Sequence, residues 1–276
     1  MIDILLATYN SQNYLEELLN SLFSQTYESW QLLVRDDKST DNTLDILNDY
    51  KQKYHDKITI IESDKNIGVV QSFETLLRAS TAPYIMFCDH DDVWLTTKIE
   101  KTLKKMIESE TIHEKTPILV HSDLMIVDEN LQTKHESFRK FSRLNNKKLL
   151  DFNYLAIASA VTGCTIMINK IAKNYCLPFH PNCQMHDWWL ALAISKHGKI
   201  EYIDEPLLLY RQHARNQLGA NTINNLASFI EHKVSNMRRV LKLNKQQFQL
   251  LKAFNFGGVH KYLIYKLKYF IITRIN

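Results

Sequence analysis

Glycine is scarce in this sequence of 276 residues. The six glycines stand at positions 68, 163, 198, 219, 257 and 258, and no two of them have the spacing G-x-G or G-x-x-x-x-G-K. These spacings belong to the dinucleotide fingerprint and the P-loop, in which glycine lets the backbone approach phosphate. Both are therefore excluded, and any diphosphate bound by this chain would have to be neutralised by a cation.

Cysteine is also sparse, and the four cysteines include no C-x-x-C pair. The N-terminus lacks the basic segment and long apolar stretch of a signal peptide. No apolar run approaches the roughly 20 residues that a membrane-spanning helix needs. We therefore expect a cytoplasmic protein with free thiols.

Acidic residues are almost absent from the C-terminal segment 217–276. That segment carries ten Lys and Arg against one acid, Glu231, whereas the rest of the chain has 24 bases and 29 acids. The net charge of +4 is thus the sum of −5 on residues 1–216 and +9 on residues 217–276. A basic tail of this kind indicates contact with an anionic surface.

Short apolar runs alternate with helical patterns in the first half of the chain. Apolar residues make up 45% of the sequence, which is enough for a packed core. The alternation predicts an α/β fold with a mostly parallel, Rossmann-like sheet flanked by helices. The predicted strands are 2–7, 30–34, 58–61 and 84–88, and the predicted helices are 14–22, a segment capped by Ser39-Thr40-Asp41, and 69–79.

The second half is less regular, with predicted strands at 117–121, 124–127, 163–168 and 206–210 and a predicted helix at 188–195. Beyond residue 221 the pattern is helical to the end. We expect one domain over residues 1–216, with halves 1–115 and 116–216, followed by a basic helical extension over 217–276.

Polar residues follow three of the predicted strands at the point where each strand ends. Thr8 follows the first strand, Asp36-Asp37 the second, and the run Asp89–Asp92 the fourth. Ligands of open α/β sheets bind outside the carboxyl ends of the strands, so these residues are expected to converge on one edge. The carboxylates of the run would repel one another without a cation, and Mg²⁺ or Mn²⁺ binds through such oxygens. A solvated acidic turn is the alternative.

Four polar segments occur in order along the first half of the chain: Ala7–Asn10, Arg35–Thr43, Asn66–Gly68 and Asp89–Trp94. Together they resemble the family 2 inverting glycosyltransferases of GT-A fold, and the resemblance extends over about residues 1–215. Within that family the chain is similar to bacterial rhamnosyltransferase-like enzymes, in which a D-x-D-D-V-W run and a late Y-R-x-H are typical.

The resemblance places the nucleotide-sugar site in residues 1–115. It implies that Thr8 lies in the loop over the base, that Asp37 accepts a hydrogen bond from the imide N–H of uracil or thymine, and that Asp36 supports this loop. Asn66 would lie at the same edge. Lys38 stands where the family commonly has glycine, which leaves the shape of the loop open.

For the sugar diphosphate, the resemblance implies that Asp89 holds the ribose and that Asp91 binds the Mn²⁺ or Mg²⁺ ion bridging the two phosphates. A late basic loop contains Arg211 and His213, which would stabilise the departing diphosphate, with His213 as a second candidate metal ligand. An exposed surface loop is the alternative interpretation.

The acceptor-binding half, 116–216, contains the motif His186–Trp189. In the resembled family an acidic residue at the start of such a helix is the catalytic base. Asp187 is therefore the candidate that takes the proton of the acceptor hydroxyl, and attack opposite the leaving group gives inversion. Asp187 could also cap the helix. Gly163-Cys164 is expected to line the acceptor side.

A possible zinc site is the main competing pattern in this half. Its four members can all bind zinc, but their spacing is unfamiliar and prolines interrupt the segment. Packing of an acceptor loop is the favoured interpretation. The four residues are Cys176, His180, Cys183 and His186.

The last twenty residues, 257–276, interleave four basic side chains with apolar and aromatic ones. This segment is too short and too charged to span a bilayer, and it suits a helix in peripheral contact with an anionic membrane surface. A helix packed on the domain with its lysines in water is the alternative. No nucleic-acid-binding module accompanies the charge, so nucleic acid is not expected as a partner.

Together these patterns predict a metal-dependent inverting glycosyltransferase that uses a dTDP- or UDP-sugar, with rhamnose implied by the resemblance. The expected acceptor is a saccharide or a lipid-linked saccharide, used at the inner face of the cell membrane in bacterial surface polysaccharide synthesis. A sugar-nucleotide nucleotidyltransferase is an alternative, although the glycine-rich, arginine-containing N-terminal loop of that class is missing. A non-catalytic carbohydrate-binding protein of the same fold is another.

Overall fold

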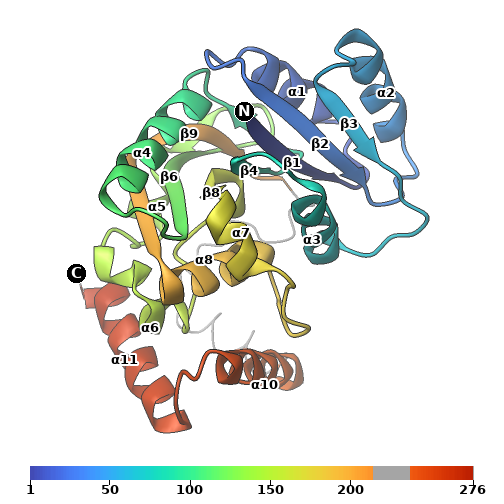
Figure 1. Cartoon of the computed structure of the whole chain (residues 1–276). Coiled ribbons are helices and arrows are strands. Elements are labelled where there is room, and N and C mark those ends of the chain that lie inside the picture. The colour runs from blue at the N-terminus through green and yellow to red at the C-terminus, as the bar shows by residue number, and fades with distance from the viewer. Residues whose placement is uncertain (214–236, 276) are drawn as a thin grey trace.

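The computed structural model describes residues 1–213 and 237–275 (Figure 1). Its N-terminal half follows the predicted alternation of strands and helices. The elements are β1 (Ile2–Thr8), α1 (Leu15–Phe23), β2 (Trp30–Asp36), α2 (Thr43–Lys53), β3 (Ile58–Ile61), α3 (Val69–Ala79) and β4 (Tyr84–Cys88). β1 lies between β2 and β4, and all three are parallel, so their carboxyl ends meet at one edge of the sheet.

The second half departs from the prediction in its longest strands. Residues 118–127 form one strand, β6 (Ile118–Val127), and not two. Its partner β9 (Lys199–Arg211) is much longer than the predicted 206–210. The pairing of β6 with β9 shifts register at Ser122 and Asp123. Such an irregularity interrupts the alternation of side chains, which explains why one strand reads as two in the sequence.

The predicted strand 163–168 is wrong in its first part, because η2 (Gly163–Thr165) is a 3₁₀-helix and only β8 (Met167–Asn169) is a strand. Helix α8 (His186–His197) begins two residues before the predicted helix and therefore contains Asp187. The other elements before residue 186 are β5 (Val93–Trp94), α4 (Lys98–Ile112), β7 (Thr133–His135), α5 (Phe138–Phe141), η1 (Lys147–Leu150), α6 (Phe152–Leu155) and α7 (Lys170–Cys176).

Across the described residues nine strands form one sheet in the order β3-β2-β1-β4-β8-β6-β9-β5, with β7 paired to β6. The first four strands are parallel, whereas β8 runs antiparallel to both β4 and β6. Two apolar clusters cover the two faces: α1 and α4 contribute to one, and α3 and α8 to the other (Figure 1). The predicted α/β fold with flanking helices is confirmed.

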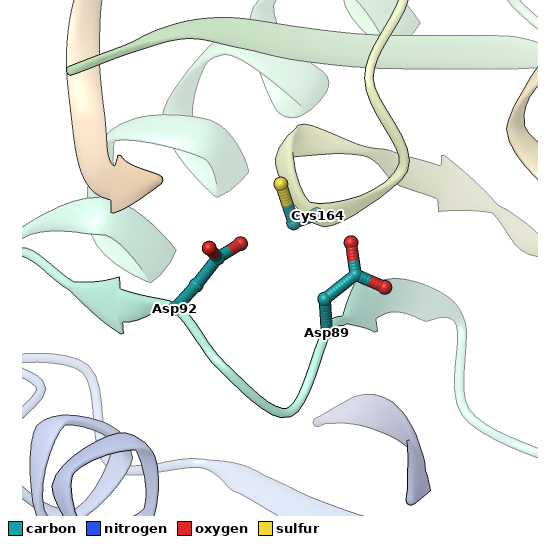
Figure 2. A group of neighbouring side chains, drawn as sticks. All are labelled: Asp89, Asp92 and Cys164. Carbon is teal, nitrogen blue, oxygen red and sulfur yellow. The ribbon is translucent and has the colours of Figure 1, made fainter. Parts of the chain in front are cut away.

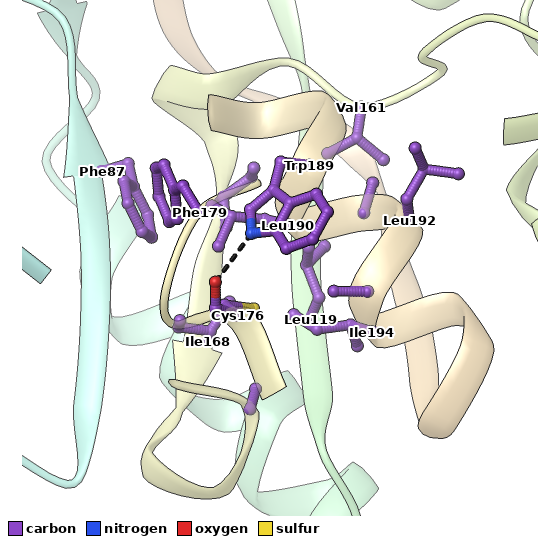
Figure 3. Close-up of a cluster of buried hydrophobic side chains, with 14 of the residues drawn as sticks. Phe87, Leu119, Val161, Ile168, Cys176, Phe179, Trp189, Leu190, Leu192 and Ile194 are labelled. Carbon is purple, nitrogen blue, oxygen red and sulfur yellow. Dashed lines mark hydrogen bonds between the residues drawn. The ribbon is translucent and has the colours of Figure 1, made fainter. Parts of the chain in front are cut away.

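The start of α8 is fixed by the apolar cluster that Figure 3 shows. Trp189 is buried there, and its Nε1–H donates to the carbonyl oxygen of Cys176 at 2.7 Å, which joins α8 to the end of α7. Leu190, Leu192 and Ile194 follow it into the cluster and are fully buried. Each such side chain contributes about 1.5–3 kcal/mol relative to an exposed one. The packing holds the first turn of α8, where Asp187 stands.

The C-terminal helices α10 (Met237–Ala253) and α11 (Val259–Ile275) pack on the same cluster. Leu250, Leu251 and Phe256 are each 1% exposed and belong to it. The predicted boundary between residues 216 and 217 lies outside the described residues. Of the helices in the two described ranges, none combines the length and the apolar character needed to cross a membrane.

Candidate active site

A cavity of ≈ 310 Å³ opens at the edge where β1, β2 and β4 end. Both halves of the chain contribute to its wall, so the predicted convergence on one sheet edge is confirmed for the residues that line it. Those predicted residues are Thr8, Asp37, Asp89, Asp91 and Asp187. The other predicted residues, all described by the structure, lie behind the wall and contact it: Asp36, Asn66, Arg211 and His213.

Asp36 fixes the loop beneath Thr8. Its carboxylate accepts hydrogen bonds from Thr8 Oγ1 at 2.9 Å and from the backbone N–H of Ser39 at 2.8 Å. In the same loop, Lys38 has a φ of 69°. This left-handed conformation favours glycine, which gives a reason for the glycine of the resembled family at that position. Lys38 therefore keeps the backbone shape of a glycine turn and adds a positive charge to it.

Asp37 is held at the cavity wall by three donors. Arg35 Nη1 donates to it at 2.6 Å, and the backbone N–H groups of Ile67 and Gly68 donate at 2.8 and 2.7 Å. Burial would raise the pKa of Asp37, but these hydrogen bonds outweigh it and lower the pKa. Asn66 donates from Nδ2 to the Asp37 carbonyl at 2.9 Å. The result is an ionised, acceptor-only group at a fixed position.

Arg211 and His213 hold the acidic turn, Asp89–Asp92, from outside the cavity. His213 Nε2 lies 2.9 Å from Asp91 Oδ2, and Arg211 Nε donates to the Asp91 carbonyl at 2.9 Å. Arg211 also pairs with the carboxylate of Glu17 on α1 and is 1% exposed. Its charge stabilises the turn in this structure. A contact of Arg211 or His213 with a departing diphosphate stays a prediction.

The oxygens of this turn suit a divalent cation. One ligand atom each of Asp89, Asp92 and Cys164 lies within 4.8 Å of the other two (Figure 2). Burial, and then the neighbouring carboxylates, raise the pKa of both Asp89 and Asp92. Among the described residues Asp92 Oδ2 has no hydrogen-bond partner. Crowded carboxylates of this kind fit a hard ion such as Mg²⁺ or Mn²⁺, for which a thiol is a poor ligand.

The zinc alternative receives no support from the described residues, because the Asp89, Asp92 and Cys164 group is the one set of three potential ligands that lies so close together. Cys176 is buried in the apolar cluster of Figure 3. His186 is stacked on Phe73, with 3.9 Å between ring centroids. Packing therefore explains Cys176 and His186 better than a zinc site does.

A buried lysine beneath the acidic turn was not recognised from the sequence. Lys98 is 0% exposed, its Nζ donates to the Cys164 carbonyl at 2.9 Å, and it lies 4.2 Å from the centroid of the Trp94 ring. Burial lowers its pKa to about 8, although the nearby acids act in the opposite direction. Lys98 therefore carries positive charge at neutral pH and joins the turn to the Cys164 segment. Its position on the buried stripe of α4 was the available signal.

Replacing Lys98 with Met is expected to lower the free energy of unfolding by about 1–3 kcal/mol, because the Cys164 carbonyl loses its donor while staying buried. Added Mn²⁺ should restore part of the loss by supplying positive charge to the turn. Thermal unfolding with and without Mn²⁺ measures both effects. Lys101→Met, on the exposed side of the same helix, is the matched control and should change stability by less than about 0.5 kcal/mol. Equal stability of the two variants would contradict the role of Lys98.

Asp187 lines the same cavity as Asp89 and Asp91 and stands in the first turn of α8. The N–H of Trp188 donates to its Oδ1 at 2.6 Å, and the N–H of Gly163 also donates to the carboxylate. Burial dominates these bonds and raises the pKa of Asp187 to about 6. Its charge in turn contributes to the raised pKa of Asp89, so the two carboxyl groups are close. A carboxylate with this pKa is a suitable general base near neutral pH.

Gly163 sets the distance between the cavity-lining segment 159–163 and α8. A Cβ on this residue would lie 2.8 Å from Nε2 of His186, closer than side-chain atoms pack. His186 is 2% exposed and stacks on Phe73 and Phe87. Gly163 was expected to line the acceptor side, where a residue without a Cβ lets the backbone approach a sugar. The structure gives a second reason, which is that only glycine leaves room for the His186 ring beside the candidate base.

The cavity thus combines an ionised hydrogen-bond acceptor, a cluster of carboxylate oxygens suited to a cation, and a further carboxylate with a raised pKa. These groups fit the class of protein that the sequence resembles, the glycosyltransferases of GT-A fold.

Comparisons with known proteins agree. The model of the family "Glycosyl transferase family 2" matches residues 3–176. The chain is 30% identical over 228 residues to the dTDP-rhamnosyl transferase RfbG of Shigella flexneri, and the match covers 78% of this chain and 74% of RfbG. The chain belongs to glycosyltransferase family 2.

Two further similarities are consistent with this assignment. The glucosyltransferase WfgD of Escherichia coli, which is named for transfer from UDP-Glc to GlcNAc-diphosphoundecaprenol, is 24% identical over 206 residues, 74% of this chain and 73% of WfgD. Residues 1–349 of S. aureus TarS in complex with UDP-GlcNAc have the same fold, with a TM-score of 0.63 at 18% identity over 100% of this chain and 74% of that one. The chain is thus a glycosyltransferase of GT-A fold.

Proposed function

We propose that this enzyme is a metal-dependent inverting glycosyltransferase that moves a sugar from a dTDP- or UDP-sugar to a saccharide or lipid-linked acceptor in bacterial surface polysaccharide synthesis. The observation that carries the proposal is that the acidic turn and Asp187 line one cavity together with Thr8 and Asp37. Rhamnose is the proposed donor sugar, because RfbG is a dTDP-rhamnosyl transferase.

The donor would bind along the first half of the chain. Asp37 accepts the imide N–H of the base, Thr8 covers the base, and Asp89 holds the ribose. Asp91, together with nearby oxygens of the turn, would hold Mn²⁺ or Mg²⁺, which supplies positive charge to the diphosphate. His213 is a further candidate ligand, because its ring already contacts Asp91.

Transfer depends on Asp187. Its carboxylate accepts the proton of the acceptor hydroxyl as that oxygen attacks the anomeric carbon from the face opposite the leaving diphosphate. The proton ends on Asp187, the bond to the diphosphate breaks, and the configuration at the anomeric carbon inverts. The direct test is release of nucleoside diphosphate from dTDP-rhamnose and UDP-sugars in the presence of Mn²⁺ and candidate acceptors.

The acceptor and the place of the reaction are linked. WfgD is named for a diphosphoundecaprenol-linked acceptor, a lipid that resides in a membrane. An acceptor of that class would place this enzyme at the inner face of the cell membrane, with the basic C-terminal segment 257–276 in peripheral contact.

Base selectivity gives a binding test that does not depend on the acceptor. UDP and CDP are a matched pair, because cytosine has an acceptor nitrogen where uracil has the imide N–H. With Asp37 fixed as an ionised acceptor, UDP and TDP should bind at least about tenfold more tightly than CDP, since a charged hydrogen bond is replaced by two facing acceptors. Isothermal titration calorimetry with Mn²⁺ measures the three Kd values. Equal affinity for UDP and CDP would rule out Asp37 as the base-reading group.

A further inference from the structure

Helix α11 has two apolar faces. On the inner face Tyr262, Tyr265, Tyr269 and Ile272 are partly buried against the main apolar cluster. On the opposite face a second set of apolar side chains is between 43% and 61% exposed. We call this second set the outer face of α11; it consists of Val259, Leu263, Ile264, Leu267, Phe270 and Ile271.

Contacts of the inner face fix the orientation of the helix. Tyr265 packs edge-on against Tyr154 of α6, with 5.3 Å between ring centroids, and Tyr262 Oη donates to Gln247 Oε1 of α10 at 3.2 Å. In Figure 1, α11 lies at the margin of the domain, with α6 beside it on the side of the domain. Rotating α11 to bury its outer face would therefore expose its inner one.

Three of the four Lys and Arg side chains of α11 stand at the borders between the two faces, and the fourth, Arg274, lies over the outer-face ring of Phe270 at 5.9 Å. Lys261 lies over the ring of Phe256, which precedes α11, and Lys266 and Lys268 lie over the inner-face rings of Tyr262 and Tyr265. The distances from Nζ to the ring centroids are 4.7, 5.4 and 5.0 Å. At 100° per residue these lysines flank the outer face on both sides. The helix has no acidic residue. An exposed apolar stripe with cations on both sides and no anion is complementary to a surface of apolar chains under anionic headgroups.

We propose that the outer face of α11 lies in the headgroup region of an anionic lipid bilayer, with the helix axis in the plane of the membrane. A second copy of the chain is a poorer occupant, because two outer faces in contact would bring the basic borders of both copies together. This inference deepens the proposed function and rests on it, because the proposed function includes a lipid-linked acceptor.

The same helix pair contacts the residues that immediately precede a cavity-lining segment. Gln247 is 7% exposed, and its Nε2 donates to the carbonyl oxygens of Ala156 and Ile157 at 2.8 and 3.1 Å. The segment that follows, 159–163, lines the cavity. Two successive hydrogen bonds therefore connect α11 to the residues before segment 159–163: one joins Tyr262 to Gln247, and the next joins Gln247 to Ala156 or Ile157.

The test is sedimentation of the full chain with vesicles of phosphatidylcholine containing phosphatidylglycerol and with vesicles of phosphatidylcholine alone. We expect binding to the anionic vesicles. The variant Leu263→Gln/Leu267→Gln/Phe270→Gln should lower the partition coefficient more than about tenfold. Lys266→Gln/Lys268→Gln should lower it about tenfold on anionic vesicles only. The matched control, Ile107→Gln/Ile112→Gln, removes exposed apolar groups from α4 and should sediment like the unmodified protein.

Unchanged sedimentation of the outer-face variant, or no binding of the unmodified protein to anionic vesicles, would overturn the inference. So would a dimer that the outer-face variant converts to a monomer in light scattering, since the face would then be a protein interface. UDP binding is measured on the same samples. Intact UDP binding without vesicle binding rejects the membrane contact alone, whereas vesicle binding without nucleotide binding rejects the proposed donor site alone.

Discussion

Replacing Asp187 with Asn is expected to lower kcat for sugar transfer by about 10²- to 10⁴-fold, the range that a general base contributes. Asn keeps the size of the side chain and still accepts the N–H of Trp188, so α8 should keep its first turn. Because Asp187 shares no hydrogen-bond partner with Asp37 among the described residues, affinity for UDP should not change. Initial rates of diphosphate release and calorimetric UDP binding measure the two effects separately.

The pH dependence should identify the group. Burial raises the pKa of Asp187 to about 6, and only the ionised form can accept a proton. Transfer by the unmodified enzyme should therefore reach its plateau above pH 6 and fall as the pH drops through 6. The Asn variant should lose this acid limb. Asp45→Asn, an exposed acid in the first turn of α2, is the matched control and should keep both the rate and the limb. Loss of UDP binding in the Asp187 variant would instead indicate a structural role.

The second large effect concerns the acidic turn. Removal of divalent cations with EDTA should reduce transfer more than about 10²-fold, because the departing diphosphate then has no cation to neutralise it. Asp91→Asn should have a similar effect, and excess Mn²⁺ should restore activity to the chelated unmodified enzyme but much less to the variant. Rates of diphosphate release across a Mn²⁺ titration measure this.

Mn²⁺ binding itself, followed by electron paramagnetic resonance, separates ligand loss from misfolding. Asp64→Asn, an exposed acid after β3, should bind Mn²⁺ as the unmodified enzyme does. Turnover that is insensitive to EDTA, or an Asp91→Asn variant with full activity, would remove the metal from the proposed mechanism.

The N-terminal half could be read from the sequence because its strands are short, buried and regularly spaced between helices. Position 38 shows that even a departure from the family pattern keeps its physical meaning, since Lys38 adopts the left-handed φ of a glycine. The strands of the second half were harder to predict from the sequence, and the reason lies in their local residue pattern. Charged residues such as Glu201 and Asp204 interrupt the apolar pattern of β9, so its full length is not predicted. The register shift at Ser122 and Asp123 interrupts the pattern of β6, which was therefore predicted as two strands.

Other features depend on residues that are distant in the chain. Lys98 contacts a carbonyl 66 positions later, and Gln247 contacts carbonyls about 90 positions earlier. No local pattern reports such pairs, because they exist only after the sheet has formed. The division of α11 into an inner and an outer face could not be predicted from the sequence for a different reason. Apolar residues occur all round this helix, and only the packing on α6 separates those facing the domain from those facing out.

The hydrogen bonds from Gln247 to Ala156 and Ile157 have a thermodynamic consequence. If a lipid surface bound to α11 stabilises the ordered form of segment 156–163, affinity for acceptor rises by some factor. Reciprocity requires that bound acceptor then raise affinity for the lipid surface by the same factor. An enzyme with this coupling stays bound longer to membranes that carry its acceptor and dissociates sooner once transfer is complete. Its distribution in the cell would therefore follow the supply of acceptor.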